Sequence, residues 1–269
     1  MTEDSILSKL RRHSRFIGDD CAIVRPRANE DLLFTTDFSI ESVHFTRDQK
    51  AADIGYRALA RSLSDIAAMG GRPRYCLVSL ALAPWTDTRW IDAFYSGLLK
   101  LAGSTGTALA GGDLSHSGQL TIDVMVCGSI ARGKALRRSG AKAGDTIYVS
   151  GPLGGWTHKP LIVPRLDLGR KLAGKAHSCM DISDGLALDL HRLCRESGVA
   201  ADIETVPLLP GASVEQALHD GEDYELLYTA AEQVPGIPIG SIRKGRAGAL
   251  TFAGKRLQPR GYDHTQHSS

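Results

Sequence analysis

The chain has 269 residues, of which 42% are hydrophobic and 23% are charged. These proportions lie close to the globular average, so the chain has enough apolar residues for a sizeable core and is neither a disordered protein nor a disulfide-stapled miniprotein. Its 32 lysines and arginines against 30 aspartates and glutamates give a net charge of +2, which gives no reason to expect a nucleic-acid or membrane partner.

Three further features of the sequence bear on the cellular setting. Residues 1–6 lack the basic start and apolar stretch of a secretion signal, so we expect a cytoplasmic protein. The longest nearly apolar stretch, residues 76–85, is about half of the ~20 residues that a membrane-spanning helix needs. The 5 cysteines are odd in number, widely spread and without a C-x-x-C pair, which predicts buried or inert thiols.

Hydrophobic periodicity predicts alternating strands and helices in the first half of the chain. Strands are expected over residues 32–36, 75–83 and 121–127. A helix over 53–69 shows apolar residues at a 3.6-residue spacing and stops at Gly70. A second helix over 86–102 is predicted to be capped by Thr86 or Asp87 and ended by Gly103.

A polar, glycine-containing segment over residues 136–145 predicts a domain boundary near residue 135. It divides the chain into an N-terminal domain, 1–135, and a C-terminal domain, 136–269. Beyond it we expect strands over 146–151 and 224–229, and between them an amphipathic helix over 185–197 that stops at Gly198. The elements show no regular βαβ rhythm, which favours an α+β fold in two domains over one doubly wound sheet.

Aspartates are the most informative residues, because several stand where a strand or turn ends. They occur in Gly18-Asp19-Asp20, Thr35-Thr36-Asp37, Ser64-Asp65, Gly111-Gly112-Asp113 and Asp181-Ile182-Ser183-Asp184. Taken singly, each is explained as a turn former or helix cap. Taken together they indicate a magnesium site, since Mg²⁺ prefers oxygen ligands and would offset the mutual repulsion of the acids. Asp65 lies at the edge of a buried helix stripe, where an unpaired charge costs several kcal/mol.

The Gly111-Gly112 pair would let backbone N–H groups approach a phosphate closely. The chain has no P-loop, no protein-kinase signature set and no G-x-G-x-x-G after a strand. If the chain binds ATP, it therefore does so without any of these common nucleotide-binding motifs.

The order of the motifs resembles the thiamine-monophosphate kinase family, nearly end to end. The motifs lie at residues 18–22 (GDDCA), 35–45 (TTDFSIESVHF), 53–60 (DIGYRALA), 63–70 (LSDIAAMG), 111–113 (GGD), 117–122 (SGQLTI), 137–141 (RRSGA), 144–154 (GDTIYVSGPLG), 181–186 (DISDGL), 221–226 (GEDYEL) and 261–264 (GYDH). An ordered set of this kind is far more specific than any single motif.

The resemblance implies a fold, a reaction and a set of residue roles. The fold would be that of the aminoimidazole-ribonucleotide-synthetase-like superfamily, with an N-terminal domain that binds ATP and magnesium and pairs in a homodimer, and a C-terminal α+β domain that covers the site. The reaction would transfer the γ-phosphoryl group of ATP to thiamine monophosphate. Carried over by position, the magnesium ligands would be Asp20, Thr35, Thr36, Asp37, Asp65, Asp113, Asp181 and Asp184. Gly112, Arg138 and Ser183 would contact the ATP phosphates, Tyr95 would lie near the nucleotide, and His44, Glu222 and Tyr262 would contact the substrate.

The expected chemistry suits these residue types. The acceptor is a phosphate monoester whose second pKa is about 6, so it is largely dianionic at neutral pH and needs no general base. The obstacle is the repulsion between two polyanions, which calls for several Mg²⁺ ions and an arginine; we expect Asp37, Asp65, Asp113 and Arg138 to carry the reaction. Three of the residues assigned by resemblance also have a plainer interpretation: Arg138 as a solvated linker charge, His44 as a hydrogen-bonded strand-end histidine, and Glu222 as a turn residue.

The sequence departs from the family pattern in its C-terminal half. Only eight residues, 156–163, lie where the family usually carries an extra helix or more, and a second shortening precedes Gly221. Tyr262 stands where a tryptophan is expected, at a position suited to a cation–π contact with thiamine. Two alternatives therefore stay open: another ATP-dependent synthetase of the superfamily, and a nucleotide-binding partner protein with a reduced catalytic lid.

Overall fold

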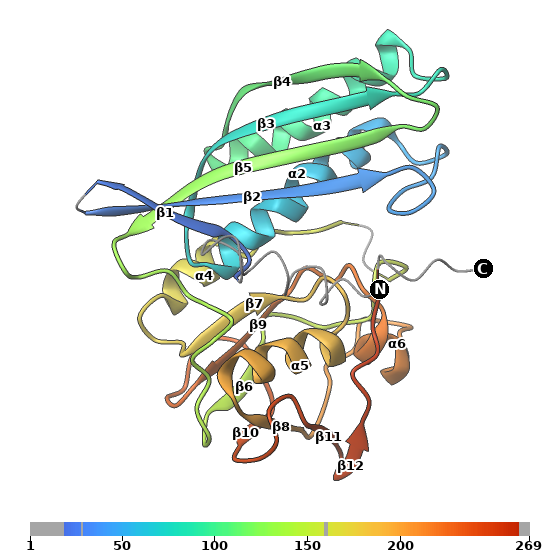
Figure 1. The fold of residues 1–269 in the computed structure, drawn as a ribbon. Helices are drawn as coiled ribbons and strands as arrows, with labels where there is room; N and C mark the ends of the chain where they lie inside the picture. The colour runs from blue at the N-terminus through green and yellow to red at the C-terminus, as the bar shows by residue number, and fades with distance from the viewer. Residues whose placement is uncertain (1–18, 28, 159–160, 264–269) are drawn as a thin grey trace.

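The computed structural model describes residues 19–27, 29–158 and 161–263, and in them the chain forms two β-sheets with helices packed against them (Figure 1). The first sheet uses residues up to Ala131, and the second begins at Thr146. The predicted boundary near residue 135 falls in the segment that joins them. This architecture confirms the α+β class expected from the sequence.

The first sheet has five strands in the order β1-β2-β5-β3-β4. Their bounds are Ala22–Arg27 for β1, Glu30–Ile40 for β2, Arg72–Leu82 for β3, Ala108–His116 for β4 and Thr121–Ala131 for β5. All neighbours pair antiparallel except β3 and β4, which are parallel. Side chains alternate between faces along each strand, so that Leu33, Leu80 and Val124 are buried under the helices.

Helices α2 (Ala51–Ala68) and α3 (Thr88–Thr105) cover one face of this sheet and approach each other at glycines (Figure 1). A Cβ atom at Gly97 would lie 1.8 Å from the Ala52 carbonyl oxygen. The Asp87 side chain accepts a hydrogen bond from the Trp90 N–H at 2.8 Å, which confirms it as the cap of α3. The predicted stop at Gly103 is wrong: the helix continues to Thr105 and ends at Gly106, whose φ of 70° is the left-handed conformation that closes a helix.

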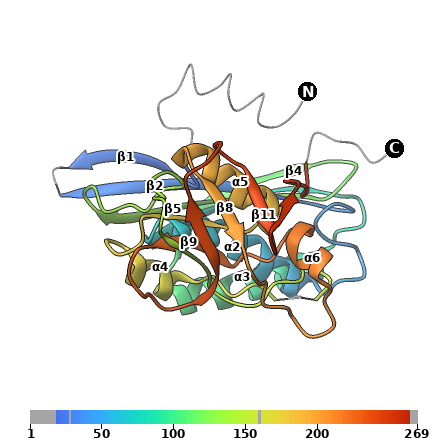
Figure 2. The same ribbon diagram turned by 90° about the horizontal axis from the view of Figure 1, so that it is seen from below.

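The second sheet has seven strands in the order β12-β11-β8-β10-β6-β9-β7. Their bounds are Thr146–Val149 (β6), Ser178–Asp181 (β7), Ala200–Ile203 (β8), Leu226–Ala230 (β9), Ile237–Arg243 (β10), Leu250–Phe252 (β11) and Lys255–Leu257 (β12). Helix α5 (Leu186–Ser197) buries Leu186, Leu190 and Leu193 and ends at Gly198, as predicted. The shorter helices α4 (Leu166–Leu172) and α6 (Val214–His219) lie at opposite ends of this half (Figure 2).

The two halves pack against each other through α2. This helix contacts α4, β7 and β9, and one hydrophobic core cluster contains residues of both sheets, such as Phe94 and Tyr228. The five cysteines are free thiols, four of them buried and Cys127 half-buried, which confirms the sequence expectation. Within the described residues no helix is long and apolar enough to cross a membrane.

Candidate active site

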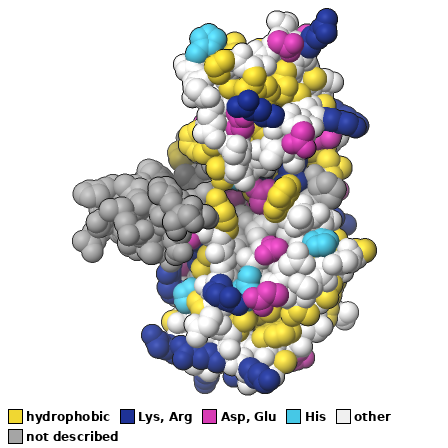
Figure 3. Space-filling view, turned by 90° about the vertical axis from the view of Figure 1, so that its right-hand side faces the viewer, with side chains coloured by type: hydrophobic (Ala, Val, Ile, Leu, Met, Phe, Trp, Pro, Cys, Tyr) yellow, Lys and Arg dark blue, Asp and Glu magenta, His cyan; other side chains and the backbone are white. Residues whose placement is uncertain are grey.

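A cavity of about 460 Å³ lies where the two halves meet, and we call it the central cavity. All of the predicted site residues except Tyr95, Gly112 and Asp113 line it. The lining residues come from the segment before β1, from β2 and the loop after it, from α2, from the segments before and after β6, from the loops around β7 and β9, and from the segment after β12. Acidic side chains are visible at the level where the two halves meet (Figure 3).

Three aspartates from distant parts of the chain form a carboxylate cluster at the cavity. Asp20 precedes β1, Asp65 stands in the last turns of α2, and Asp181 ends β7; one carboxylate oxygen of each lies within 4.8 Å of the others. Burial raises the pKa of Asp65 well above its ordinary value, and the charges of Asp37, Asp181 and Asp20 raise it further. Burial and the Asp20 charge likewise raise the pKa of Asp181. Such mutually repelling carboxylates fit a divalent cation between them.

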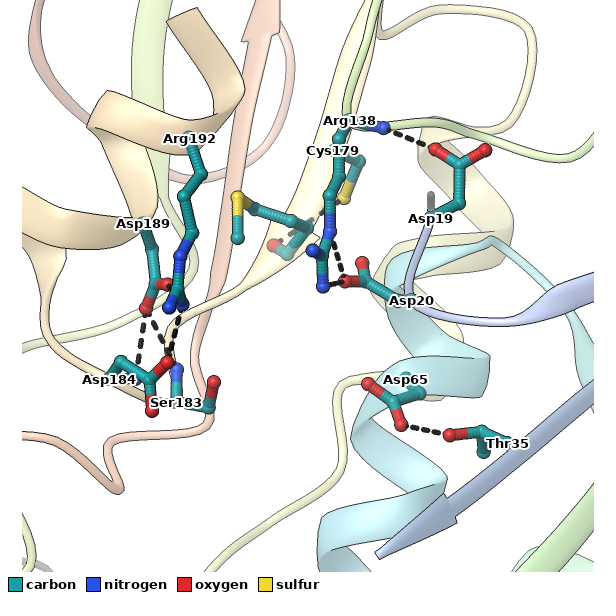
Figure 4. Close-up of polar contacts among 11 residues, drawn as sticks. Asp19, Asp20, Thr35, Asp65, Arg138, Cys179, Ser183, Asp184, Asp189 and Arg192 are labelled. Carbon is teal, nitrogen blue, oxygen red and sulfur yellow. Dashed lines mark hydrogen bonds and ion pairs between the residues drawn. The ribbon is translucent and has the colours of Figure 1, made fainter. Parts of the chain in front are cut away.

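Strand β2 supplies the next residues on the same side. The Thr35 hydroxyl donates a hydrogen bond to Asp65 (Figure 4), and burial raises the pKa of Asp37, two residues further along the strand. Thr36 alternates to the opposite face of the sheet, where its hydroxyl donates to Asp123. The hydroxyl of Thr36 is therefore directed away from the carboxylate cluster, although the residue borders the cavity.

Arg138 lies against the carboxylate cluster and is not a solvated linker charge. Its Nε donates to Asp20 Oδ1 at 2.7 Å, and its backbone N–H donates to Asp19 at 3.0 Å (Figure 4). Burial lowers the pKa of the Arg138 guanidinium, but the Asp20 charge outweighs this effect and the pKa ends above its ordinary value. The second oxygen of Asp20, Oδ2, is buried and makes no hydrogen bond within the described part of the chain.

A carboxylate that the sequence reasoning missed, Asp189, holds the loop that carries Ser183 and Asp184. Its Oδ2 accepts the backbone N–H groups of Ser183 at 3.1 Å and Asp184 at 3.0 Å, and Arg192 pairs with both aspartates (Figure 4). Burial raises the pKa of Asp189 to about 7, with repulsion from Asp184 as the next cause. Its position in the first turn of the predicted helix was the available signal, because a carboxylate there can reach back to N–H groups before the helix.

The GEDYEL motif, residues 221–226, holds two other segments of the C-terminal half in place. Asp223 accepts the N–H groups of Gly154 and Gly155, each at 3.1 Å, and so fixes the glycine loop after β6. Glu225 forms a two-pronged ion pair with Arg165, at 2.8 and 2.6 Å. These two acids are structural anchors within the C-terminal half.

Glu222 links the C-terminal half to α2 of the N-terminal half through two ion pairs. Arg57 Nη2 donates to it at 2.6 Å and Arg61 Nη1 at 2.9 Å, both from α2. The motif adopts left-handed backbone conformations, with φ of 70° at Glu222 and 49° at Tyr224, a geometry that is uncommon for residues other than glycine. Glu222 is thus more than a turn residue, since it forms a buried ion-pair network between the halves that only the tertiary structure reveals.

His44, Trp156 and Tyr262 complete the lining. His44 Nδ1 accepts the Ile40 N–H at 3.0 Å, which in the neutral ring places the proton on Nε2. Trp156 and Tyr262 are 47% and 46% exposed at the cavity. The backbone N–H of Trp156 donates to the Gly221 carbonyl at 3.2 Å, and the backbone N–H of Tyr262 donates to the Asp184 carbonyl at 2.9 Å, so both exposed aromatic residues are held beside the acidic loops. Trp156 lies in the shortened segment and was not predicted to be a site residue.

Three predicted site residues lie away from the central cavity. Gly112 and Asp113 are on β4, an exposed edge strand that β5 and β3 separate from β2. The register places Asp113 beside Ser79 and Ser79 beside Asp123, on the face of the sheet that the helices do not cover. Tyr95 packs edge-on against Phe94 on α3. The fold of one chain therefore does not bring Asp113 to Asp37 and Asp65, contrary to the expectation that they share cations within it.

The central cavity combines a buried acidic cluster, two arginines and exposed aromatic rings. Carboxylates can hold divalent cations, guanidinium groups can bind phosphate oxygens, and aromatic faces can attract an organic cation. No side chain here needs to act as a nucleophile for a phosphate group to be transferred between two bound molecules.

Comparison with known proteins gives matches over nearly the whole chain. A family model described as AIR synthase related protein, N-terminal domain, matches residues 18–130. Thiamine-monophosphate kinase of Haemophilus influenzae is 36% identical over 245 residues, which cover 79% of this chain and 74% of the relative. The enzyme of that name from Rhodopirellula baltica is 33% identical over 312 residues, 97% of each chain. A solved structure of AaThiL complexed with AMPPCP and TMP has a TM-score of 0.90 at 30% identity and covers 98% of this chain and 97% of that one.

The alignment with the Rhodopirellula baltica relative is longer than the chain itself, 312 positions against 269 residues. That relative therefore carries residues that this chain lacks, in agreement with the shortening that the sequence indicates. The TM-score of 0.90 with the AaThiL structure shows that this chain shares that fold.

Proposed function

The chain belongs to the thiamine-monophosphate kinase family of enzymes, and on that premise we propose that it transfers the γ-phosphoryl group of ATP to thiamine monophosphate, giving thiamine diphosphate and ADP. The observation that carries the proposal is the carboxylate cluster of Asp20, Asp65 and Asp181, which opens on one cavity together with Arg138 and Arg61. A site that holds two phosphate-bearing molecules together needs this mixture of cation-binding and anion-binding groups.

The proposed reaction is a direct displacement. A phosphate oxygen of thiamine monophosphate forms a bond to the γ-phosphorus as the bond from that phosphorus to the β-bridging oxygen breaks, and ADP leaves. Because the acceptor is already largely dianionic at neutral pH, no side chain has to remove a proton. The work of the protein is to align the two phosphates and to exclude water, which the packing of the two halves around the cavity favours.

The carboxylate cluster fits Mg²⁺. Its oxygens converge within 4.8 Å, burial raises the pKa of each acid, and Asp20 Oδ2 is buried without a hydrogen bond from any described residue. We assign Asp20, Asp65 and Asp181 as the principal ligands, with Thr35 and Asp37 beside them. Bound Mg²⁺ would neutralise the phosphate oxygens. Thr36 and Asp184 already bond Asp123 and Arg192, so we propose them as outer members of the site.

The remaining lining residues are proposed to orient the substrates. Arg138, from the side of Asp20, and Ser183, from the loop that Asp189 holds, would contact the ATP phosphates. The exposed rings of Trp156 and Tyr262 would contact the cationic thiamine, with His44 and Glu222 nearby. This assignment gives the shortened segment a role, since Trp156 adds a second aromatic ring to the tyrosine that stands in the expected tryptophan position.

We also propose that the enzyme is a homodimer formed through the first sheet. Strand β4 is exposed along its whole length, and apolar side chains such as Phe38, Tyr75 and Leu114 are 55%, 55% and 62% exposed on this sheet. An exposed strand edge next to exposed apolar side chains is typical of a surface that another protein chain buries. A second copy would cover both, and would place Gly112 and Asp113 of one copy within reach of the nucleotide site of the other. The two proposed domains, 1–135 and 136–269, would then contribute the dimer contact and the lid.

Incubation with Mg-ATP and thiamine monophosphate tests the function. We expect ADP and thiamine diphosphate in equal amounts, and we expect Asp37→Asn to lose turnover while the circular dichroism spectrum is unchanged. Thiamine without its phosphate is the matched control acceptor. ATP binding without either product at saturating Mg²⁺ would support a nucleotide-binding partner protein instead, and turnover with a different acceptor would support another synthetase of the superfamily.

A further inference from the structure

Arg61 is a buried cation at the centre of the molecule that the motif comparison did not single out. It stands on α2, one turn after Arg57 and one turn before Asp65, and only 7% of its surface is exposed. It lines the central cavity, whereas Arg57, which pairs with the same glutamate, is not among the lining residues.

The guanidinium of Arg61 has more donors than its protein partners use. Within the described residues its side chain donates one hydrogen bond, from Nη1 to Glu222 at 2.9 Å. Its Nε is buried and makes none with any described residue. The Tyr224 ring lies with its centroid 5.6 Å from the guanidinium carbon and accepts no hydrogen bond from it. A guanidinium carries five N–H donors, and donors left unpaired in a buried site are costly unless a ligand accepts from them.

Glu222 fixes the direction in which these donors face. Glu222 Oε1 accepts a hydrogen bond from Nη1 of Arg61, and the other oxygen, Oε2, accepts one from Nη2 of Arg57 at 2.6 Å. The planar group is thereby immobilised before any ligand arrives, and pre-organised donors lose little entropy on binding. Asp37 and Asp184 lie close enough to act on Arg61 electrostatically, and all three residues line the central cavity.

The neighbours of Arg61 identify the end of the cavity that it serves. It contacts Glu222 and Tyr224, and the preceding residue of that loop, Gly221, accepts the backbone N–H of Trp156. This is the aromatic end of the cavity, proposed above for thiamine. Arg138 lies instead against Asp20, on the nucleotide side of the carboxylate cluster.

We propose that Arg61 binds the phosphate monoester of the acceptor substrate, held in place by Glu222. The proposal rests on the function proposed above and adds a substrate-binding residue to it. A charge-assisted hydrogen bond to a phosphate predicts about a 10- to 100-fold weaker binding when the guanidinium is removed.

The test compares Arg61→Met with Arg57→Met by isothermal titration calorimetry at fixed Mg²⁺. Both variants remove one ion pair to Glu222, but only the first removes a cation from the cavity lining. For Arg61→Met we expect thiamine monophosphate to bind about 10- to 100-fold more weakly, with the affinities for ATP and for unphosphorylated thiamine within about twofold of the unmodified protein. Arg57→Met leaves Arg61 in the cavity lining and removes only the second partner of Glu222, so it should weaken the binding of thiamine monophosphate much less than Arg61→Met does. Arg61→Lys keeps the charge and should recover part of the loss, which provides a second variant if the methionine chain folds poorly.

The outcomes separate the two proposals. Equal weakening by Arg57→Met and Arg61→Met, or equal weakening toward thiamine and its monophosphate, would overturn the role of Arg61 and leave it as a structural partner of Glu222. If the unmodified protein makes no thiamine diphosphate, the proposed function fails. Titration with inorganic pyrophosphate then decides for Arg61 alone: binding that disappears in Arg61→Met keeps the anion site, and equal binding by both proteins removes it.

Discussion

Replacement of Asp65 by asparagine should make the metal-free protein more stable and the enzyme inactive. The three carboxylates of the cluster lie within 4.8 Å of one another, and at that separation two unit charges repel by about 3 kcal/mol at an effective dielectric constant of about 20. Asparagine at position 65 removes two of the three pairs. Proton uptake already relieves part of this repulsion in the unmodified protein, so we expect a gain of about 1–3 kcal/mol in the free energy of unfolding.

The assay is urea unfolding at pH 7.5 with EDTA and again with saturating Mg²⁺. Mg²⁺ should stabilise the unmodified protein and leave Asp65→Asn nearly unchanged, because a ligand that binds only the folded state raises its stability by mass action. The pKa of Asp65 is raised in the folded state, so its cost to stability appears as the pH rises above the unfolded value of 3.8, and the gain from asparagine should shrink toward pH 5.

The exposed Asp92→Asn on α3 is the control, with an expected change below about 0.5 kcal/mol. A less stable Asp65→Asn in EDTA at pH 7.5 would refute the reasoning, as would equal stabilisation of both proteins by Mg²⁺.

Three further predictions concern other parts of the molecule. The pKa of Asp189 is raised to about 7, so the stability of the metal-free protein should fall between about pH 4 and 7, and Asp189→Asn should flatten that part of the profile of unfolding free energy; an unchanged slope would contradict the assignment. Gly97→Ala should cost about 2 kcal/mol or more in urea unfolding, because its Cβ would meet a backbone oxygen of α2 at 1.8 Å. Gly103→Ala on the same helix, where a Cβ would have nothing within 4 Å, should raise the free energy of unfolding by up to about 1 kcal/mol. Similar changes at both sites would show that the contact between α2 and α3 does not cause the loss of stability at Gly97. Leu114→Arg on β4 should convert dimer to monomer in sedimentation velocity while the circular dichroism spectrum is kept, and an unchanged sedimentation coefficient would place the dimer contact elsewhere.

The local pattern of the sequence predicted most of the elements, because hydrophobic spacing and capping residues are local properties. The strands predicted over 32–36, 75–83 and 121–127 fall within or close to β2, β3 and β5, and Asp87 caps α3 as expected. The end of α3 was predicted wrongly. Gly103 was the predicted stop of α3, but the helix continues to Thr105 because Leu101 and Ala102 pack into the core and hold the last turn in place.

The choice of Asp20, Asp65 and Asp181 as candidate ligands also came from the sequence, through the position of aspartates at element ends and through the family motifs. What the sequence by itself determined was therefore the identity of the acids and the class of fold. Only the tertiary structure decided which of them meet, because a shared site depends on how strands order themselves in a sheet: β5 and β3 separate Asp113 from Asp37, and the alternation along β2 turns Thr36 away from Thr35. The same holds for Arg61 and Glu222, which lie 161 residues apart in sequence and form an ion pair only because α2 packs between the two sheets.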